Sequence, residues 1–87
     1  MYVILVYDCG EKRVAKMLKL CRRYLNWIQN SVFEGEISES RLKELVINAK
    51  EFLNEDEDSI IIFKNRAAIT FSKEIVGKER CSIDNFL

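Results

Sequence analysis

The sequence lacks histidine and proline altogether, and it has only three glycines among its 87 residues. Without histidine, the usual general base of serine, cysteine and histidine-dependent ribonuclease active sites is missing. A nuclease built from this chain would therefore need a metal ion to activate water and to stabilise the leaving oxygen. The absence of proline and the hydrophobic content of 48% also argue against a long disordered tail.

Cysteine is scarce, and long apolar runs are absent. Cys9, Cys21 and Cys81 are widely spaced and form no Cys-x-x-Cys pair, which argues against zinc and for a reducing cytoplasm, where they would be small buried hydrophobic residues. No segment reaches the ~18 consecutive apolar residues of a membrane span. The apolar run Met1–Tyr7 has no preceding basic region and continues directly into Asp8, so we expect a strand rather than a signal peptide, and no membrane partner.

Charge is balanced in total but unbalanced along the chain. The formal net charge is zero, which by itself would count against a nucleic-acid partner. Residues 11–30, however, hold six basic side chains and one acidic side chain, whereas residues 31–58 hold nine acidic and three basic side chains. This split predicts one basic and one acidic face, and a phosphate group responds to the local field rather than to the total charge.

Four stretches have the character of strands. Tyr2–Tyr7 is a continuous apolar run, as in a central strand covered on both faces, and Ser59–Lys64 predicts a second buried strand. Ala67–Val76 alternates like a half-exposed strand. Trp27–Ile37 is extended in character, and one bent strand or two short paired strands are both compatible with it.

Two amphipathic helices are predicted between these strands. The first begins near Lys12 and frays near Leu25, and its core-facing stripe consists of Val14, Met17, Leu18, Cys21, Leu25 and Ile28. The second follows Ser38, whose side chain can cap it, and its apolar residues recur as far as Leu53. The apolar residues of the final segment, Cys81–Leu87, are expected to dock on another surface.

This order of elements predicts a single α+β domain over residues 1–87, with two helices packed on one face of a single sheet. The opposite face of that sheet would have no cover of its own, and a chain this short has little core to spare. A second copy of the chain is the simplest cover. We therefore expect a homodimer that forms through the uncovered sheet face.

Asp8 is the first candidate for chemistry because of its position. It lies where an apolar strand ends and a glycine-containing turn leads into a helix, which is a common ligand site in strand–helix folds. Mg²⁺ often binds through one or two carboxylates and takes further oxygens from substrate phosphates. The alternative is a helix cap, since Asp8-x-x-Glu11 approximates a capping box, and spacing alone favours the cap.

The predicted first helix also carries the candidates for phosphate contact. Basic residues recur at helical spacing on one face, where they could meet a nucleic-acid backbone or simply be solvated. These candidates, with the other basic residues of the helix, are Lys12, Arg13, Lys16, Lys19, Arg22 and Arg23. Four aromatic residues could stack on bases, although aromatic residues near strands are more often core: Tyr7, Tyr24, Trp27 and Phe33.

Together these features resemble the CRISPR-associated endoribonuclease family. The opening strand, Tyr2–Asp8, ends in a Tyr-Asp pair as in that family, and a basic helix follows it. The segment Ile28–Gly35 is similar to the family's Val-Gln-x-Ser-Val-Phe-Glu stretch, so that Gln29, Ser31 and Phe33 are the motif residues. The resemblance covers nearly the whole chain and is weakest in its last dozen residues.

The resemblance implies a ferredoxin-like βαββαβ sandwich, with two strands within Trp27–Ile37 and a homodimer in which segment 78–87 pairs with the partner subunit. It implies that Asp8 binds Mg²⁺ together with its symmetry mate, and that Tyr7 and Asp8 are the catalytic residues. It further implies a metal-dependent nuclease acting on RNA or on double-stranded DNA, and a scaffold that bridges two dimers of the CRISPR spacer integrase.

One position departs from the family pattern. The family often has arginine two residues before the glutamine, where this chain has Trp27, so a possible phosphate ligand is replaced by a stacking or core residue. Two other functions therefore stay open. One is a non-catalytic DNA-binding scaffold, and the other is a toxin ribonuclease of the related virulence-associated protein D type.

Overall fold

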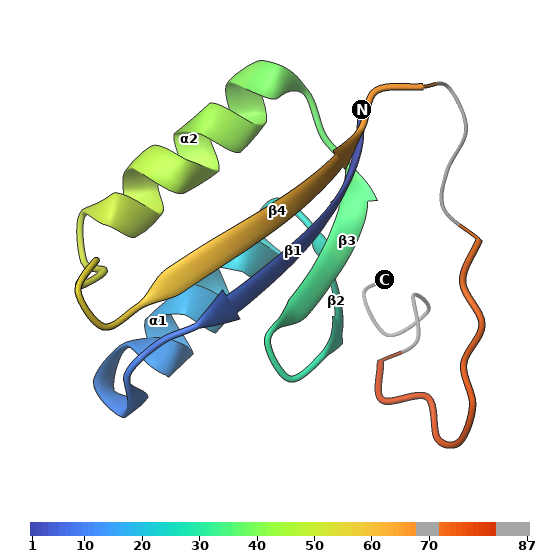
Figure 1. Cartoon of the computed structure of the whole chain (residues 1–87), viewed down its shortest axis with the longest axis horizontal. Helices are drawn as coiled ribbons and strands as arrows, with labels where there is room; N and C mark the ends of the chain where they lie inside the picture. The colour runs from blue at the N-terminus through green and yellow to red at the C-terminus, as the bar shows by residue number, and fades with distance from the viewer. Residues whose placement is uncertain (68–71, 82–87) are drawn as a thin grey trace.

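The computed structural model describes residues 1–67 and 72–81. In chain order the elements are β1 (Tyr2–Asp8), α1 (Glu11–Arg22), β2 (Asn26–Gln29), β3 (Val32–Glu36), α2 (Glu39–Lys50) and β4 (Ser59–Asn65). The strands form one antiparallel sheet in the order β2-β3-β1-β4, and both helices lie on the same face of it (Figure 1). The predicted ferredoxin-like βαββαβ arrangement is confirmed.

β1 is the central strand, and alternation along it separates two environments. Val3, Leu5 and Tyr7 face the helices and are buried, whereas Ile4 and Val6 face the other side of the sheet and are only half-buried. The prediction of cover on both faces is therefore right for the helix face alone. The continuous apolar run reflects a second face that the described part of the chain covers incompletely.

α1 is shorter than predicted, and it packs through most of the predicted stripe. It ends at Arg22, and its buried residues are Met17, Leu20 and Cys21. Val14, predicted as a core residue, is 41% exposed. Met17 and Cys21 of the predicted stripe lie in the core and Leu18 packs against it, because α1 contacts α2 and β2, whereas these contacts leave Val14 partly open.

α2 begins as predicted. The Arg41 backbone N–H donates to Ser38 Oγ at 3.2 Å, so Ser38 is the N-cap, and Glu39 lies in the first turn, where a helix favours an acid. The stretch before it contains two strands, β2 and β3, joined by a turn at Asn30, which has a left-handed φ of 46°. This agrees with the family resemblance and settles the alternative that the pattern left open.

β4 is an edge strand rather than a buried one. Ile61 and Phe63 are 53% and 54% exposed, and they lie on the same side of the sheet as Ile4 and Val6. The apolar run was misleading because only the helix-facing side of β4 is covered. We call the sheet surface opposite the helices, formed around these four residues, the open face.

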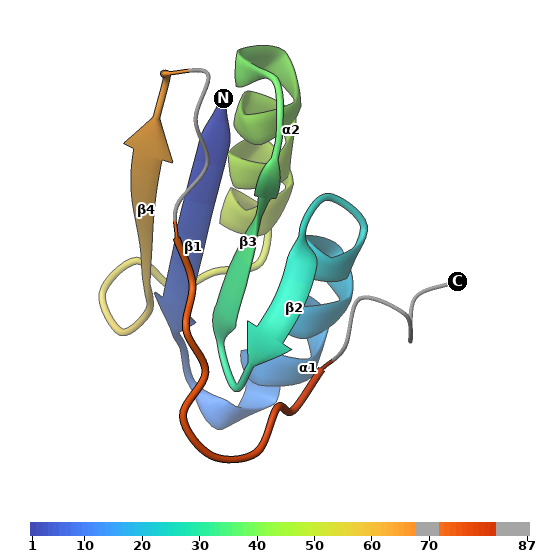
Figure 2. The ribbon, with the colours of Figure 1, turned by 90° about the vertical axis from the view of Figure 1, so that its right-hand side faces the viewer.

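The C-terminal part of the chain departs from prediction where it is described. Of the predicted strand Ala67–Val76, residues 68–71 lie outside the described residues, and residues 72–76 form no strand. Residues 72–78 run along the open face over β1 and β3, on the opposite side of the sheet from the helices (Figure 2). Residues 78–81 have no regular secondary structure, and the rest of the predicted pairing segment, 82–87, lies outside the described residues.

Two smaller expectations can be compared with the structure. Cys9, Cys21 and Cys81 are all free thiols, but only Cys21 is fully buried. Among the helices of the described residues, neither is long and apolar enough to cross a membrane.

Candidate active site

Asp8 is the last residue of β1, and its carboxylate is exposed. It lies opposite Ser59 of β4, and alternation along β1 places it on the open-face side, away from the helices. Within residues 1–67 and 72–81, the Asp8 carboxylate has no hydrogen-bond or ion-pair partner. An exposed carboxylate without a protein partner, on a rigid strand end, is free to bind a cation.

The capping-box interpretation of Asp8 and Glu11 is wrong. The N-cap of α1 is Gly10, and no side chain caps the helix locally. Because the helix begins at Glu11, Asp8 is two residues too early to reach the first free backbone N–H groups. Asp8 is therefore not occupied in holding the helix.

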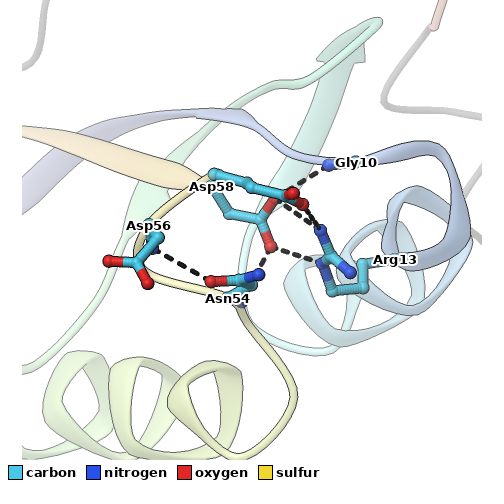
Figure 3. A network of polar contacts seen from close by, with 6 residues as sticks. Gly10, Arg13, Asn54, Asp56 and Asp58 are labelled. Carbon is cyan, nitrogen blue, oxygen red and sulfur yellow. Dashed lines mark hydrogen bonds and ion pairs between the residues drawn. The ribbon is translucent and has the colours of Figure 1, made fainter.

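The N-terminus of α1 is instead stabilised by an acid from a distant part of the chain. Asp58, whose side chain is fully buried, accepts hydrogen bonds from the backbone N–H of Gly10 at 2.8 Å and of Asn54 at 2.9 Å. The Arg13 guanidinium forms an ion pair with the same carboxylate (Figure 3). We call this arrangement of Gly10, Arg13, Asn54 and Asp58 the Asp58 clasp.

The clasp has a clear electrostatic signature. The hydrogen bond from Arg13 and the two backbone N–H donors hold the pKa of Asp58 well below its usual range, against the opposing effect of its removal from water. The same pairing raises the pKa of Arg13. Both groups are charged at all ordinary pH values, so the clasp is a permanent link between the segment after β1 and the segment before β4.

Asp58 is not among the residues predicted from the sequence, because it is the last residue of an acidic segment whose side chains are expected to be solvated. No short-range pattern marks Asp58, because the Gly10 N–H that it accepts from lies 48 positions away in the sequence. Arg13, predicted to bind nucleic acid, is bound to Asp58 and, at 2.9 Å, to Glu57. Its guanidinium is therefore engaged within the protein.

Tyr7, the other predicted catalytic residue, is part of the core. It is 4% exposed and stacks against Phe33 with ring centroids 6.1 Å apart. Burial is the main cause that raises the pKa of Tyr7 to about 12, so its hydroxyl keeps its proton near neutral pH. Adjacent strand residues face opposite sides, and the Tyr7 side chain is thus directed away from Asp8.

The three motif residues differ in burial and in the contacts that they make. Phe33 is completely buried against Tyr7, and this excludes both rings as platforms for bases. Ser31 lies in the β2–β3 turn, where its carbonyl accepts a hydrogen bond from the Tyr7 N–H at 3.1 Å. Gln29 is exposed at the end of β2. The motif thus includes the packing and backbone contacts that fix the strand end before Asp8.

The remaining basic candidates are exposed along α1 but do not converge on Asp8. α1 has 12 residues and is therefore about 18 Å long, with Lys12 in the turn next to Asp8 and Arg22 at the far end. Three of the cations lie over aromatic rings: Lys16 over Phe52, Arg22 over Trp27 and Arg23 over Tyr24. Lys19 is exposed between them.

Trp27 is half-buried, and a basic side chain from α1 lies beside its ring. The Arg22 guanidinium lies 5.4 Å from the centre of the Trp27 ring. A positive charge is thus present beside position 27, but it belongs to Arg22 of α1 and not to a residue of β2.

The described residues contain no group of three or more histidine, cysteine, aspartate or glutamate side chains that could hold a metal ion. One chain offers a single free carboxylate at this site. The donor is a hard oxygen, which suits Mg²⁺, and Mg²⁺ needs few protein ligands if other oxygens complete its shell. The site fits Mg²⁺ only if a second carboxylate or substrate phosphates contribute.

The open face is covered unevenly by its own chain. Glu34 of β3 accepts a hydrogen bond from the Tyr2 hydroxyl at 2.9 Å and forms an ion pair with Lys73, which ties residues 72–78 to the β3 side. On the β4 side, Ile61 and Phe63 are left exposed. An exposed apolar surface of this kind beside the Asp8 strand end is typical of a protein interface.

Comparison with known proteins agrees with this architecture. The family model described as CRISPR associated protein Cas2 matches residues 1–70. A CRISPR-associated endoribonuclease Cas2 2 from Archaeoglobus fulgidus is 47% identical over 79 residues, which cover 91% of this chain and 86% of the relative. A CRISPR-associated endoribonuclease Cas2 from Thermotoga maritima is 45% identical over 92% of each chain.

Solved structures are similar as well. A crystal structure of Cas2 with 42% sequence identity superposes with a TM-score of 0.83, covering 95% of this chain and 93% of that chain. Cas2 from Streptococcus pyogenes, at 28% identity, has a TM-score of 0.68 over 75% of this chain and 86% of its own.

Proposed function

Because this chain belongs to the CRISPR associated protein Cas2 family, we propose that it is a dimeric, Mg²⁺-dependent endonuclease that hydrolyses phosphodiester bonds of RNA, double-stranded DNA or both. The observation that carries this proposal is the exposed Asp8 carboxylate, which has no hydrogen-bond or ion-pair partner in the described residues. The relatives named endoribonucleases support hydrolysis as the reaction.

Asp8 from each of two subunits would hold the Mg²⁺ ion, with phosphate oxygens of the substrate as further ligands. Bound there, the ion would supply Lewis-acid stabilisation of the phosphodiester and a more acidic water molecule. The protein contributes position: the Asp58 clasp fixes the segment after Asp8, and the Tyr7 N–H bond to Ser31 fixes the strand before it. Lys12, in the first turn of α1, is the cation best placed for the scissile phosphate.

The open face is the proposed dimer interface. Ile61 and Phe63 would be removed from water there, and the Asp8 strand ends lie on the same side of the sheet. A two-fold axis through this face would bring the two Asp8 carboxylates toward each other, which a monomer cannot do.

A second role is favoured by the spread of the basic residues. Hydrolysis needs a cation near Asp8, yet Lys16, Lys19 and Arg23 continue along a helix of about 18 Å. We propose that this surface holds duplex DNA while the dimer bridges two dimers of the spacer integrase. That role requires no metal at Asp8.

The decisive experiment is a Mg²⁺ titration of cleavage with the parent protein and the Asp8→Asn variant. Cleavage should rise with Mg²⁺ in the parent and fall by at least about 100-fold in the variant, whose fold and thermal stability should be unchanged because Asp8 has no described hydrogen-bond or ion-pair partner. Asp56→Asn, which removes an exposed carboxylate from the acidic segment, is the matched control and should cut like the parent.

If rigorously purified Asp8→Asn cuts as fast as the parent, the hydrolytic mechanism is wrong. Retained spacer acquisition in cells with that variant would then identify the scaffold as the function. Loss of acquisition, with the fold intact, would tie the physiological role to Asp8.

A further inference from the structure

A recess of about 390 Å³ lies beside Asp8 and has no role in the mechanism above. It is formed where the tip of β1, the α1 helix and the β2–β3 turn meet at one end of the sheet (Figure 2). Its lining residues are Tyr7, Asp8, Cys9, Val14, Leu18, Trp27, Asn30 and Ser31. Asp8 thus belongs to both the candidate catalytic position and the wall of the recess.

Much of the wall is apolar and is supplied by three side chains. Val14, 41% exposed, and the half-buried Leu18 come from α1, and Trp27 comes from β2. The Trp27 indole N–H already donates to the Asn30 carbonyl at 2.9 Å, so the ring contributes apolar surface rather than a free donor. Val14 is an aliphatic side chain left partly open beside an aromatic one, which suits contact with a flat ring.

The opposite rim is polar and held in place. The Asn30 carbonyl is bonded to Trp27, and the Ser31 carbonyl is bonded to the Tyr7 N–H. The Asn30 amide and the Ser31 hydroxyl have no hydrogen-bond partner in the described part of the chain. They therefore present a donor–acceptor pair on a turn whose backbone is fixed.

The lining includes no lysine or arginine, and its one charged group is Asp8. A phosphate would be repelled there, whereas a neutral heterocycle with an apolar face and a hydrogen-bonding edge matches both sides of the recess. We propose that the recess binds one nucleobase of an unpaired nucleotide whose backbone passes Asp8. This assignment rests on the proposed nuclease function, and it deepens that function by giving the site a preference for bases that are not stacked in a duplex.

Trp27 is the only tryptophan in the chain and lines the recess, so it reports on occupancy directly. The probes are single-stranded decauridylate and an abasic ribose-phosphate decamer of equal length and charge. Both are titrated against the whole protein in EDTA, where cleavage does not interfere. We expect decauridylate to quench Trp27 fluorescence and to bind about tenfold more tightly than the abasic strand, because only decauridylate offers a base that can stack in the recess.

The Val14→Ser and Asn30→Gly double variant removes the aliphatic wall and the amide without changing charge. Glycine tolerates the left-handed φ of 46° at position 30, so the turn is kept. The tenfold preference should fall to less than about twofold, and affinity for the abasic strand should stay the same. Ile47→Ser, at a 61% exposed position on α2, is the matched control and should keep the full preference.

Equal quenching and equal affinity for the two parent titrations would overturn the proposal, as would a full preference in the double variant. These binding measurements use no Mg²⁺ and no cleavage. They can therefore fail while Asp8→Asn still abolishes hydrolysis, and they can succeed if hydrolysis is disproved.

Discussion

The Asp58 carboxylate accepts a hydrogen bond from the backbone N–H of Gly10 at 2.8 Å, across 48 positions of the sequence. Through this bond an acid from the α2–β4 connection takes the place of a local cap at the start of α1, where the helix dipole favours a negative charge. The same carboxylate neutralises Arg13. As a result, Asp8 does not cap α1, and the Arg13 guanidinium binds Asp58 instead of being available to a phosphate.

The Asp58 clasp leads us to expect that replacing Asp58 lowers thermal stability much more than replacing its neighbour Glu57. Asp58→Ala would leave Arg13 and two backbone N–H groups without their acceptor in a buried position, and we expect the midpoint of thermal unfolding to fall by several degrees. Glu57→Gln removes an exposed partner of the same arginine and should shift the midpoint by less than about 2 °C. Circular dichroism melting curves measure both, and equal shifts would contradict the central role of Asp58.

Because the pKa of Asp58 is lowered, we expect its contribution to the free energy of unfolding to change with pH only under acidic conditions. Because the folded-state pKa lies below the unfolded value of about 3.9, the clasp contributes its full stability above that pH and loses it as pH falls toward the folded pKa. Urea unfolding of the parent should therefore weaken below about pH 4, more steeply than that of Asp58→Asn. Parallel pH profiles for the two proteins would show that Asp58 is not the group involved.

The exposed position of Phe63 on the open face allows a test of the proposed dimer interface. It is 54% exposed on the open face, so Phe63→Glu should preserve the fold and disrupt the proposed dimer. Removing two buried phenylalanines at ~1.5–3 kcal/mol each should weaken association by at least about 100-fold. Light scattering after size exclusion measures the mass, and Ile47→Glu, on the helix side, should remain dimeric. A dimer unaffected by Phe63→Glu would place the interface elsewhere.

The basic residues in the middle of α1 predict salt-dependent duplex binding. Changing Lys16 and Lys19 to glutamine should weaken binding several-fold and reduce the slope of log affinity against log salt by about 1.8, because each phosphate contact contributes about 0.9. Lys43 and Lys50, exposed on α2, provide the equal-charge control pair, whose replacement should leave the slope near the parent value. An identical slope in both double variants would remove α1 as the contact surface.

Local patterns predicted several elements well. β1 was read from its apolar run, α2 from its period and its Ser38 cap, and the helix after Asp8 from the change of period at Lys12. The apolar periods and the Ser38 cap depend on residues only a few positions apart, so their physics is present in any short window of sequence. The two strands β2 and β3 needed the family resemblance, because no standard turn dipeptide marks Asn30.

The candidate site was predicted less completely. Asp8 was predicted to lie at the end of the first strand, and it does, but its lack of a partner in the described residues could be known only after Gly10 proved to be the N-cap. Tyr7 reads as half of a Tyr-Asp pair, and only packing against Phe33 shows that it faces the core. The recess beside Trp27 joins three elements and has no signature in any one of them.

What the sequence determined by itself is the order of β1, α1, α2 and β4 and the position of Asp8 at the end of the first strand, since these follow from periodicity and short-range hydrogen bonding. The tertiary structure alone decided that Asp58 holds Gly10 and Arg13, that β4 is an exposed edge, and that α1 turns Val14 outward. Those outcomes depend on which distant surfaces meet, and the energy of a buried ion pair or an apolar contact exists only once they do.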